Sequence, residues 1–152
     1  MADFLNPEER SKLMSRIRGR DTKPEMRVRK LLHRLGYRYR VHDRTLPGSP
    51  DLVFRRRGRV VFIHGCFWHG HSCQKRDVET LAPFWRNKIR GNQNRDVRSV
   101  LRLLASGWAV LVVWECELKV RDMPDLEHRL VTFLGPTAVP RRSCGFANQH
   151  PA

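Results

Sequence analysis

The sequence is short of acidic residues, with 15 Asp and Glu against 30 Lys and Arg, which leaves a formal net charge of +15 at pH 7. A field of this sign attracts polyanions over long distances. Basic residues are spread from Arg10 to Arg142, and no segment has the pattern of a basic amphipathic membrane helix. The composition therefore favours nucleic acid as the partner. A basic ribosomal or RNA-binding protein is the alternative that charge alone leaves open.

Long apolar runs are also missing. The first ten residues hold no signal-type apolar stretch, and the most apolar segment, residues 109–114, is far too short to span a bilayer. We therefore expect a cytoplasmic protein with no membrane partner. In a reducing compartment, the four cysteines are expected to be metal ligands or buried thiols rather than disulfides.

Neither an internal repeat nor a low-complexity block interrupts the chain, and 152 residues suit one cored domain. Asn6, Pro7 and Glu9 form a helix-start pattern, and Thr22 with Glu25 forms a capping box. Hydrophobic spacing predicts four helices, over residues 7–17, 23–35, 95–106 and onward from Pro124. It predicts strands over residues 37–41, 52–54, 60–63 and 108–114. This order indicates a single α/β domain with a central mixed sheet flanked by helices.

The chain divides by composition into three parts. Residues 1–20 form a basic N-terminal arm and helix that we expect to contact DNA, and residues 21–135 form the core. Residues 136–152 are rich in Pro, polar and basic residues and are expected to form a loosely ordered tail. The apolar run 108–114 suits a strand that is covered on both faces.

The segment Phe62–Cys73 packs three imidazoles, two thiols and two adjacent large aromatics into one stretch. Imidazole and thiolate are the preferred ligands of zinc, so Cys66, His71 and Cys73 form a candidate clip, with Cys116 as a fourth ligand from across the fold. The competing ligands are His64, His69 and Cys144. The alternative is a merely polar loop beside a buried Cys116 thiol.

Histidines that a zinc ion leaves out are free to move protons near neutral pH. His69 stands beside two bulky aromatics and is the better candidate for activating water. Asp51, at the start of a strand, is the carboxylate best suited to magnesium, because a hairpin would place it beside residues 63 and 64. A turn residue is the alternative for Asp51.

Two further acids have a structural explanation. Glu25 is explained as a capping-box acid, which makes a catalytic role a secondary hypothesis. Asp96 sits where the predicted helix start favours an acid, and we assign it no chemistry.

Phe67 and Trp68 are consecutive, and on a loop between metal ligands they project together as a wedge. Apolar wedges enter between base pairs and unstack duplex DNA. The alternative is a hydrophobic patch under the loop. Met14, Phe84 and Trp85 are further candidates for contacting bases, although each is equally compatible with the core.

These residues together resemble the very short patch repair endonucleases. The resemblance runs from about Ser11 to about Glu117, and the residues that carry it include Ser11, Lys12, Met14, Arg20, Asp21, Thr22, Glu25, Pro50, Asp51, Phe62–His69, His71, Cys73, Phe84, Trp85 and Trp114–Cys116. It implies a monomeric, restriction-endonuclease-like fold with a structural zinc. The implied activity is a magnesium-dependent nick in one DNA strand, 5′ to the thymine of a T:G mismatch that arises when 5-methylcytosine deaminates.

The resemblance also implies roles for single residues. Asp51 and the Ile63 carbonyl would hold magnesium, His69 would act as general base, His64 would assist at the phosphate, and Glu25 would support the histidines. Cys66, His71, Cys73 and Cys116 would bind zinc, while Met14, Phe67 and Trp68 would intercalate. A bacterial, nucleoid-associated location and a functional association with a cytosine-5 methyltransferase are implied as well.

The sequence departs from the family at two positions near the site. Ile63 replaces a threonine, which a backbone carbonyl ligand tolerates, and Gly70 replaces a histidine. The usual lysine of this nuclease architecture is absent, and histidines take its place. Two alternatives remain: a zinc-stabilised endonuclease with a different target, and a non-catalytic zinc-bearing DNA-binding module.

Overall fold

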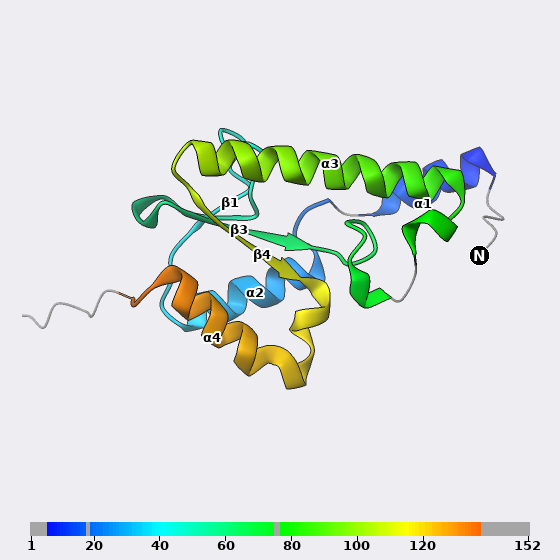
Figure 1. Ribbon diagram of the computed structural model, residues 1–152. Helices are drawn as coiled ribbons and strands as arrows, with labels where there is room; N and C mark the ends of the chain where they lie inside the picture. The colour runs from blue at the N-terminus through cyan, green and yellow to red at the C-terminus, as the bar shows by residue number, and fades with distance from the viewer. Residues whose placement is uncertain (1–5, 18, 75–76, 138–152) are drawn as a thin grey trace, which may run out of the picture.

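The computed structural model describes residues 6–17, 19–74 and 77–137. Its sheet contains four strands, β1 (Arg40–Val41), β2 (Leu52–Phe54), β3 (Arg59–His64) and β4 (Ala109–Trp114), in the order β1-β2-β3-β4 (Figure 1). β1, β2 and β3 pair antiparallel, and β3 pairs parallel with β4. The expected α/β fold with a mixed sheet is therefore confirmed. Its likeness to restriction endonucleases stays a prediction.

Helices cover both faces of this sheet. α1 (Pro7–Arg16) and α2 (Lys23–Arg34) precede the sheet, α3 (Pro83–Ala105) joins β3 to β4, and α4 (Met123–Leu134) follows β4. In Figure 1, α3 lies along one face, and α2 and α4 lie against the other. The helix between β3 and β4 provides the crossover that a parallel pair requires.

The side chains of β3 alternate between two hydrophobic cores. Val61 and Ile63 pack with α2 and α4, whereas Val60 and Phe62 pack with Leu103 of α3. This alternation follows from the two-residue period of a strand. All four β3 side chains are buried, so the strand that carries the chain into the His/Cys loop is fixed from both faces.

The two predicted helix starts near the N-terminus are confirmed. The Asn6 side chain accepts a hydrogen bond from the Glu9 N–H at 2.8 Å, and the Glu9 carboxylate accepts one from the Asn6 N–H at 3.1 Å. Thr22 caps α2, and the side chain of Glu25 bonds the Thr22 hydroxyl at 2.9 Å. Both helices therefore begin as their capping residues predict.

The strand expected over residues 37–41 is shorter than predicted, because only Arg40 and Val41 pair with β2. Tyr37 is buried instead, and its hydroxyl donates a 2.6 Å hydrogen bond to the Gly135 carbonyl. Its ring meets Phe54 edge to face at 6.3 Å. The alternation of Tyr and Arg reflects this tertiary contact rather than a regular strand.

The prediction of a helix start at Asn94 was wrong, because α3 begins at Pro83. Proline is favoured in a first helical turn, where its missing N–H leaves no bond unmade. Gly91 lies within the helix, and nothing stands within 4 Å of the position of a Cβ there. Asp96 therefore lies in the middle of α3, and the explanation of this acid as a helix-start residue is also wrong.

β4 is an edge strand and is less covered than predicted. Val113 is its one fully buried residue, while Val110 and Val112 are partly buried against the α3 core and Leu111 against the other core. Both faces of β4 contact helices, but its outer edge is open because the sheet ends there.

The two terminal segments lie largely outside the described residues. Of the expected N-terminal arm, residues 6–17, 19 and 20 are described, and α1 buries none of its residues. The expected tail, together with Cys144, falls almost wholly in the undescribed range 138–152. Among the described residues, no helix is long and apolar enough to cross a membrane.

Candidate active site and metal centre

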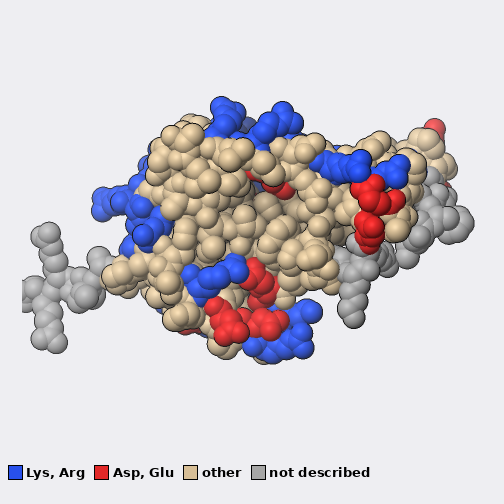
Figure 2. Space-filling view, in the orientation of Figure 1, with Lys and Arg blue, Asp and Glu red and all other residues tan. Residues whose placement is uncertain are grey.

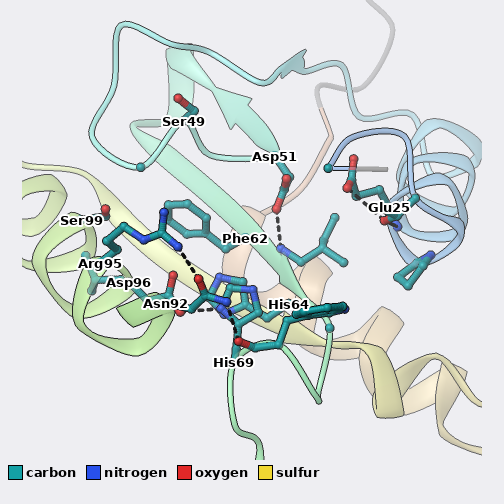
Figure 3. Close-up of a pocket in the computed structure, with 18 of the residues that line it drawn as sticks. Glu25, Ser49, Asp51, Phe62, His64, His69, Asn92, Arg95, Asp96 and Ser99 are labelled. Carbon is teal, nitrogen blue, oxygen red and sulfur yellow. Dashed lines mark hydrogen bonds and ion pairs between the residues drawn. The ribbon is translucent and has the colours of Figure 1, made fainter. Parts of the chain in front are cut away.

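An open cleft of ≈ 1140 Å³ lies between the α1–α2 connection, the end of β3 and the helix α3 (Figure 3). The expected catalytic side chains Glu25, Asp51, His64 and His69 all line it. Asp96 lines it as well. The structure thus brings together acids and imidazoles from four separate parts of the sequence.

Asp51 lies directly before β2, and the hairpin places it beside β3 as the sequence predicts. Its Oδ2 accepts a hydrogen bond from the Ile63 N–H at 2.7 Å. Burial and then the nearby charge of Glu25 raise the pKa of Asp51 to about 6, against the opposing effect of that hydrogen bond. A carboxylate in this environment is stabilised by a bound cation, so its surroundings fit a divalent metal ion.

His64 and His69 form a stacked pair of imidazoles. Their ring centroids lie 3.8 Å apart, and the ring planes differ by 5°. Burial, and then the proximity of His69, lower the pKa of His64 to about 4. His64 is therefore neutral at physiological pH, and the stack carries at most one proton charge at that pH.

His69 has a partner that the sequence reasoning missed. Its Nδ1 lies 2.5 Å from Oδ2 of Asp96. Asn92, Asp96 and Ser99 recur at helical spacing and all line the cleft, so this polar stripe was a detectable signal. The predicted helix starts too late to include Asn92, the first residue of the stripe.

Glu25 occupies the other side of the cleft, within a network on α2. Its carboxylate accepts hydrogen bonds from the Asp21 N–H at 3.0 Å and from Arg29 Nη2 at 3.1 Å. His42 Nε2 lies 3.3 Å from the same carboxylate. Glu25 therefore contacts His42, a residue that the sequence did not single out. Figure 3 shows Glu25 on the opposite side of Asp51 from the histidine pair.

The four predicted zinc ligands converge at the other end of the His/Cys loop. The donor atoms of Cys66, His71, Cys73 and Cys116 all lie within 4.8 Å of one another. Cys116 Sγ stands 3.5 Å from His71 Nδ1. A tetrahedral zinc ion, with bonds of about 2.0–2.3 Å, separates its ligands by about 3.3–3.8 Å, so small shifts suffice to close the shell.

The chemistry of these donors also fits a soft divalent ion. Burial raises the pKa of the Cys66 thiol to about 12, and burial raises the pKa of Cys116 too. A metal ion reverses this effect by stabilising the thiolates. Trp114 stacks on the His71 ring at a centroid distance of 4.2 Å and fixes its orientation. The site therefore has the donor set, the spacing and the ring support of a structural metal centre.

The expected DNA-contacting aromatics form one group beside the cleft. Phe67, Trp68 and Trp85 lie with ring centroids 5.2–6.0 Å apart, and Phe84 meets Trp85 at 5.0 Å. Phe84 is exposed, whereas the other three rings are half-buried. Trp68 and Met14 of α1 line the cleft, whereas Phe67 contacts Trp68 from outside the cleft lining.

Gly70 has a structural reason apart from ligand choice. Its φ of +63° lies in the left-handed region, and a Cβ there would come 2.5 Å from the Gln93 side chain. The neighbouring carbonyls of Trp68 and His69 accept hydrogen bonds from Asn92 at 2.7 Å and from Gln93 at 3.3 Å. The loop therefore lies close against α3, which holds His69 beside Asp96.

Basic side chains gather along the α3 edge of the molecule and around the β2–β3 turn, while the acids near α4 and at the end that carries α1 lie next to other basic side chains (Figure 2). Three exposed arginines of α3, Arg95, Arg98 and Arg102, line the cleft. The rim of the cleft formed by α3 is therefore positively charged, as binding to phosphates requires.

Comparison with known proteins places the chain. A family model described as DNA mismatch endonuclease Vsr matches residues 2–75. The chain is 48% identical over 138 residues to the type II nicking enzyme V.XorIIP of Xanthomonas oryzae, covering 90% of this chain and 100% of that protein. It is 46% identical over 123 residues to the DNA mismatch endonuclease Vsr of Escherichia coli, covering 80% and 79% of the two chains.

The fold, the cleft and these relatives define the class as a DNA endonuclease, which is a hydrolase. Within that class, the chain belongs to the Vsr family of DNA mismatch endonucleases. The expected family is therefore confirmed.

Proposed function

We propose that this chain nicks one strand of duplex DNA on the 5′ side of the thymine in a T:G mismatch, and so starts very short patch repair. Such mismatches arise by deamination of 5-methylcytosine. The observation that supports the proposal best is the convergence of Asp51 with the His69–Asp96 pair in one cleft bordered by arginines. A carboxylate and an oriented imidazole are the parts that hydrolysis of a phosphodiester needs.

Asp51 and the main-chain carbonyl of Ile63 would hold a magnesium ion. When bound, the ion stabilises the negative charge that develops on the phosphate. The Ile63 N–H fixes one Asp51 oxygen at 2.7 Å and leaves the remaining lone pairs of the carboxylate for this purpose. Glu25 would act from across the cleft, where it adds a second negative charge near Asp51.

His69 would act as the general base. An ionised Asp96 accepts the Nδ1 proton of His69, which leaves the lone pair of Nε2 free to take a proton from the attacking water. As the proton arrives, Asp96 stabilises the imidazolium that forms. Because His64 is neutral in the stack, it does not repel this charge, and it would assist at the phosphate as a hydrogen-bonding group.

Zinc would have a structural role in this proposal. Cys66, His71 and Cys73 belong to the loop that also carries His69, and Cys116 follows β4. A zinc ion at these four donors would tie the catalytic loop to the end of the sheet. The position of His69, which this loop carries, would then be fixed before DNA binds.

DNA would lie along the cleft, with phosphates near the arginines of α3. Phe67 and Trp68 would enter the base stack beside the mismatch, and Met14 would enter from α1. Phe84 and Trp85 would support this group of rings. A mismatched pair is easier to unstack than a matched one, so insertion of these side chains favours the faulty site.

The proposal also includes action as a monomer on DNA in the cytoplasm, associated with the nucleoid, and a functional association with a cytosine-5 methyltransferase. The association with a methyltransferase follows from the substrate, because the methylated cytosines made by such an enzyme are the source of the mismatches. No contact between the two proteins is required.

The proposal is tested with the parent protein and Asp51→Ala on labelled duplexes that carry a T:G pair in several flanking sequences. We expect the parent protein to nick beside the thymine in a magnesium-dependent reaction. Asp51→Ala should bind the same duplex with no cleavage. Binding without cleavage by the parent protein would instead support a DNA-binding module. Cleavage of unrelated DNA structures would support an endonuclease with a different target.

A further inference from the structure

His42 faces Asp51 across the end of the β1–β2 ladder. The register pairs Val41 with Leu52, and the His42 N–H continues it by donating to the Asp51 carbonyl at 3.3 Å. The side chain of His42 is 12% exposed, and its Nδ1 lies 3.7 Å from Asp51 Oδ1. The two residues are thus hydrogen-bonded through the backbone, and their side chains face each other.

The backbone of His42 adopts a conformation that few side chains tolerate. Its φ is +46°, in the left-handed region, which residues other than glycine adopt rarely and in which asparagine, aspartate and histidine are the most frequent exceptions. In this conformation the imidazole lies between Asp51 and α2. Tyr39 helps to hold the segment there, because its hydroxyl donates to the Arg29 carbonyl at 2.9 Å.

Arg29 decides which ring nitrogen of His42 carries the proton. Arg29 Nη2 lies 2.9 Å from His42 Nε2. A guanidinium has donors only, so this 2.9 Å contact, which is shorter than the 3.3 Å from Nε2 to the Glu25 carboxylate, makes Nε2 an acceptor and places the ring proton on Nδ1. That nitrogen faces Asp51. Arg29 is itself fixed by Asp21 at 2.6 Å and by Glu25 at 3.1 Å.

Asp21, Glu25 and His42 also have the composition of a metal site, and their donor atoms lie within 4.8 Å of one another. The Arg29 guanidinium contacts all three, however, and its charge takes the position that an ion would need. This network is therefore a support for neighbouring residues rather than a metal centre.

We propose that His42 is a positioning residue, held in one tautomer by Arg29, that orients the Asp51 carboxylate for a divalent ion. The Ile63 N–H fixes Oδ2 at 2.7 Å, and Nδ1 of His42 faces Oδ1 at 3.7 Å, which is too long for a hydrogen bond but close enough to favour one orientation of the carboxylate electrostatically. This inference rests on the proposed role of Asp51 as a metal ligand. Groups that hold a ligating carboxylate in this way typically contribute 10–100-fold in metal affinity or activity.

Two variants separate orientation from backbone strain. His42→Gly removes the side chain and relieves the left-handed conformation, whereas His42→Asn keeps an N–H donor near the position of Nδ1 and tolerates this conformation. We would titrate zinc-loaded protein with Mn²⁺ by calorimetry. We expect His42→Gly to bind Mn²⁺ about tenfold more weakly and His42→Asn to stay within about threefold of the parent protein.

Parent-like Mn²⁺ affinity in His42→Gly would overturn the inference. Equal losses of Mn²⁺ affinity in both variants would also overturn it, because they would show that the substitutions act by disturbing the fold of the loop. Nitrogen NMR of the His42 imidazole gives a second readout. We expect the Nδ1–H tautomer, and observation of the Nε2–H tautomer would contradict the inference. Asp51→Ala is the matched control. If Asp51→Ala binds Mn²⁺ as the parent protein does, the proposed metal role of Asp51 fails, which is a separate outcome from the failure of His42.

Discussion

Asp96 Oδ2 lies 2.5 Å from Nδ1 of His69, although 27 positions separate the two residues in the chain. The contact depends on α3 reaching back to Pro83, which places Asp96 in mid-helix beside the His/Cys loop. A carboxylate bonded to one imidazole nitrogen orients the ring and leaves the other nitrogen as the base. The proposed mechanism therefore rests on a pair and not on His69 alone.

Asp96→Asn is expected to lower the single-turnover nicking rate about 100-fold, because the amide neither fixes the reactive tautomer nor stabilises the imidazolium. DNA affinity should be unchanged. The measurement is quench-flow nicking of a T:G duplex, with a binding titration in parallel. Asp125→Asn, which changes an exposed aspartate of α4, is the matched control. A rate equal to that of the control would remove Asp96 from the mechanism.

His64 should make stability depend on pH. The imidazole has an ordinary pKa of 6.5, which holds in the unfolded chain, and a pKa of about 4 in the fold. Between these values the unfolded chain binds more protons, so the free energy of unfolding falls as pH drops from about 6.5 to 4. The loss is on the order of 2 kcal/mol.

Urea unfolding of the parent protein and His64→Gln at several pH values measures this effect. The variant lacks the titrating group, so its free energy of unfolding should fall less over the same range. Parallel pH profiles for the two proteins would show that protonation of His64 does not lower the free energy of unfolding over this range.

Asp51→Asn should abolish nicking and yet stabilise the protein at pH 8 when no magnesium is added. The folded pKa of Asp51 is about 6 against an ordinary 3.8, so the stability that its neutral form contributes is lost as pH rises through 6. The amide keeps an acceptor for the Ile63 N–H. We expect a gain on the order of 2 kcal/mol in urea unfolding. Added magnesium should stabilise the parent protein but not the variant. If the variant is less stable than its parent at pH 8, the ionised Asp51 carboxylate does not destabilise the fold.

Metal analysis of the purified protein should give about one zinc ion per chain, as expected for four donors in one closed shell. Cys116→Ser should lose most of this zinc and unfold at a lower temperature, because the loop is no longer tied to the end of β4. Cys144→Ser is the control, since Cys144 is the competing thiol. Loss of zinc in the Cys144 variant, with retention in the Cys116 variant, would reassign the ligand set.

Much of the fold was predictable because its signals are local. The capping groups around Asn6 and Thr22 define two helix starts, and the alternation in β3 defines its two buried faces. The start of α3 was not predictable in the same way. Asn94 is a typical helix-capping residue, which favours a helix start at that point. The residues before it are instead held in the helix by contacts that exist only in the folded protein, such as those of Asn92 and Gln93 with the His/Cys loop.

The candidate site divides along the same line. Donor types at short spacing identified Cys66, His71 and Cys73, and hairpin geometry placed Asp51 beside Ile63. Asp96 and His42 act through contacts that depend on a helix face and on a left-handed turn. His42 leaves no local pattern, whereas Asp96 belongs to the polar stripe with Asn92 and Ser99, which becomes visible only when α3 is known to begin at Pro83.

Mismatch-specific nicking is tested most directly with two duplexes that differ only in one pair, T:G or C:G, in a single-turnover reaction with magnesium present. We predict cleavage of one strand beside the thymine in the T:G duplex, while the C:G duplex and the opposite strand stay intact. Equal cleavage of both duplexes, or no cleavage of either in any flanking sequence, would contradict the proposed mismatch-specific activity.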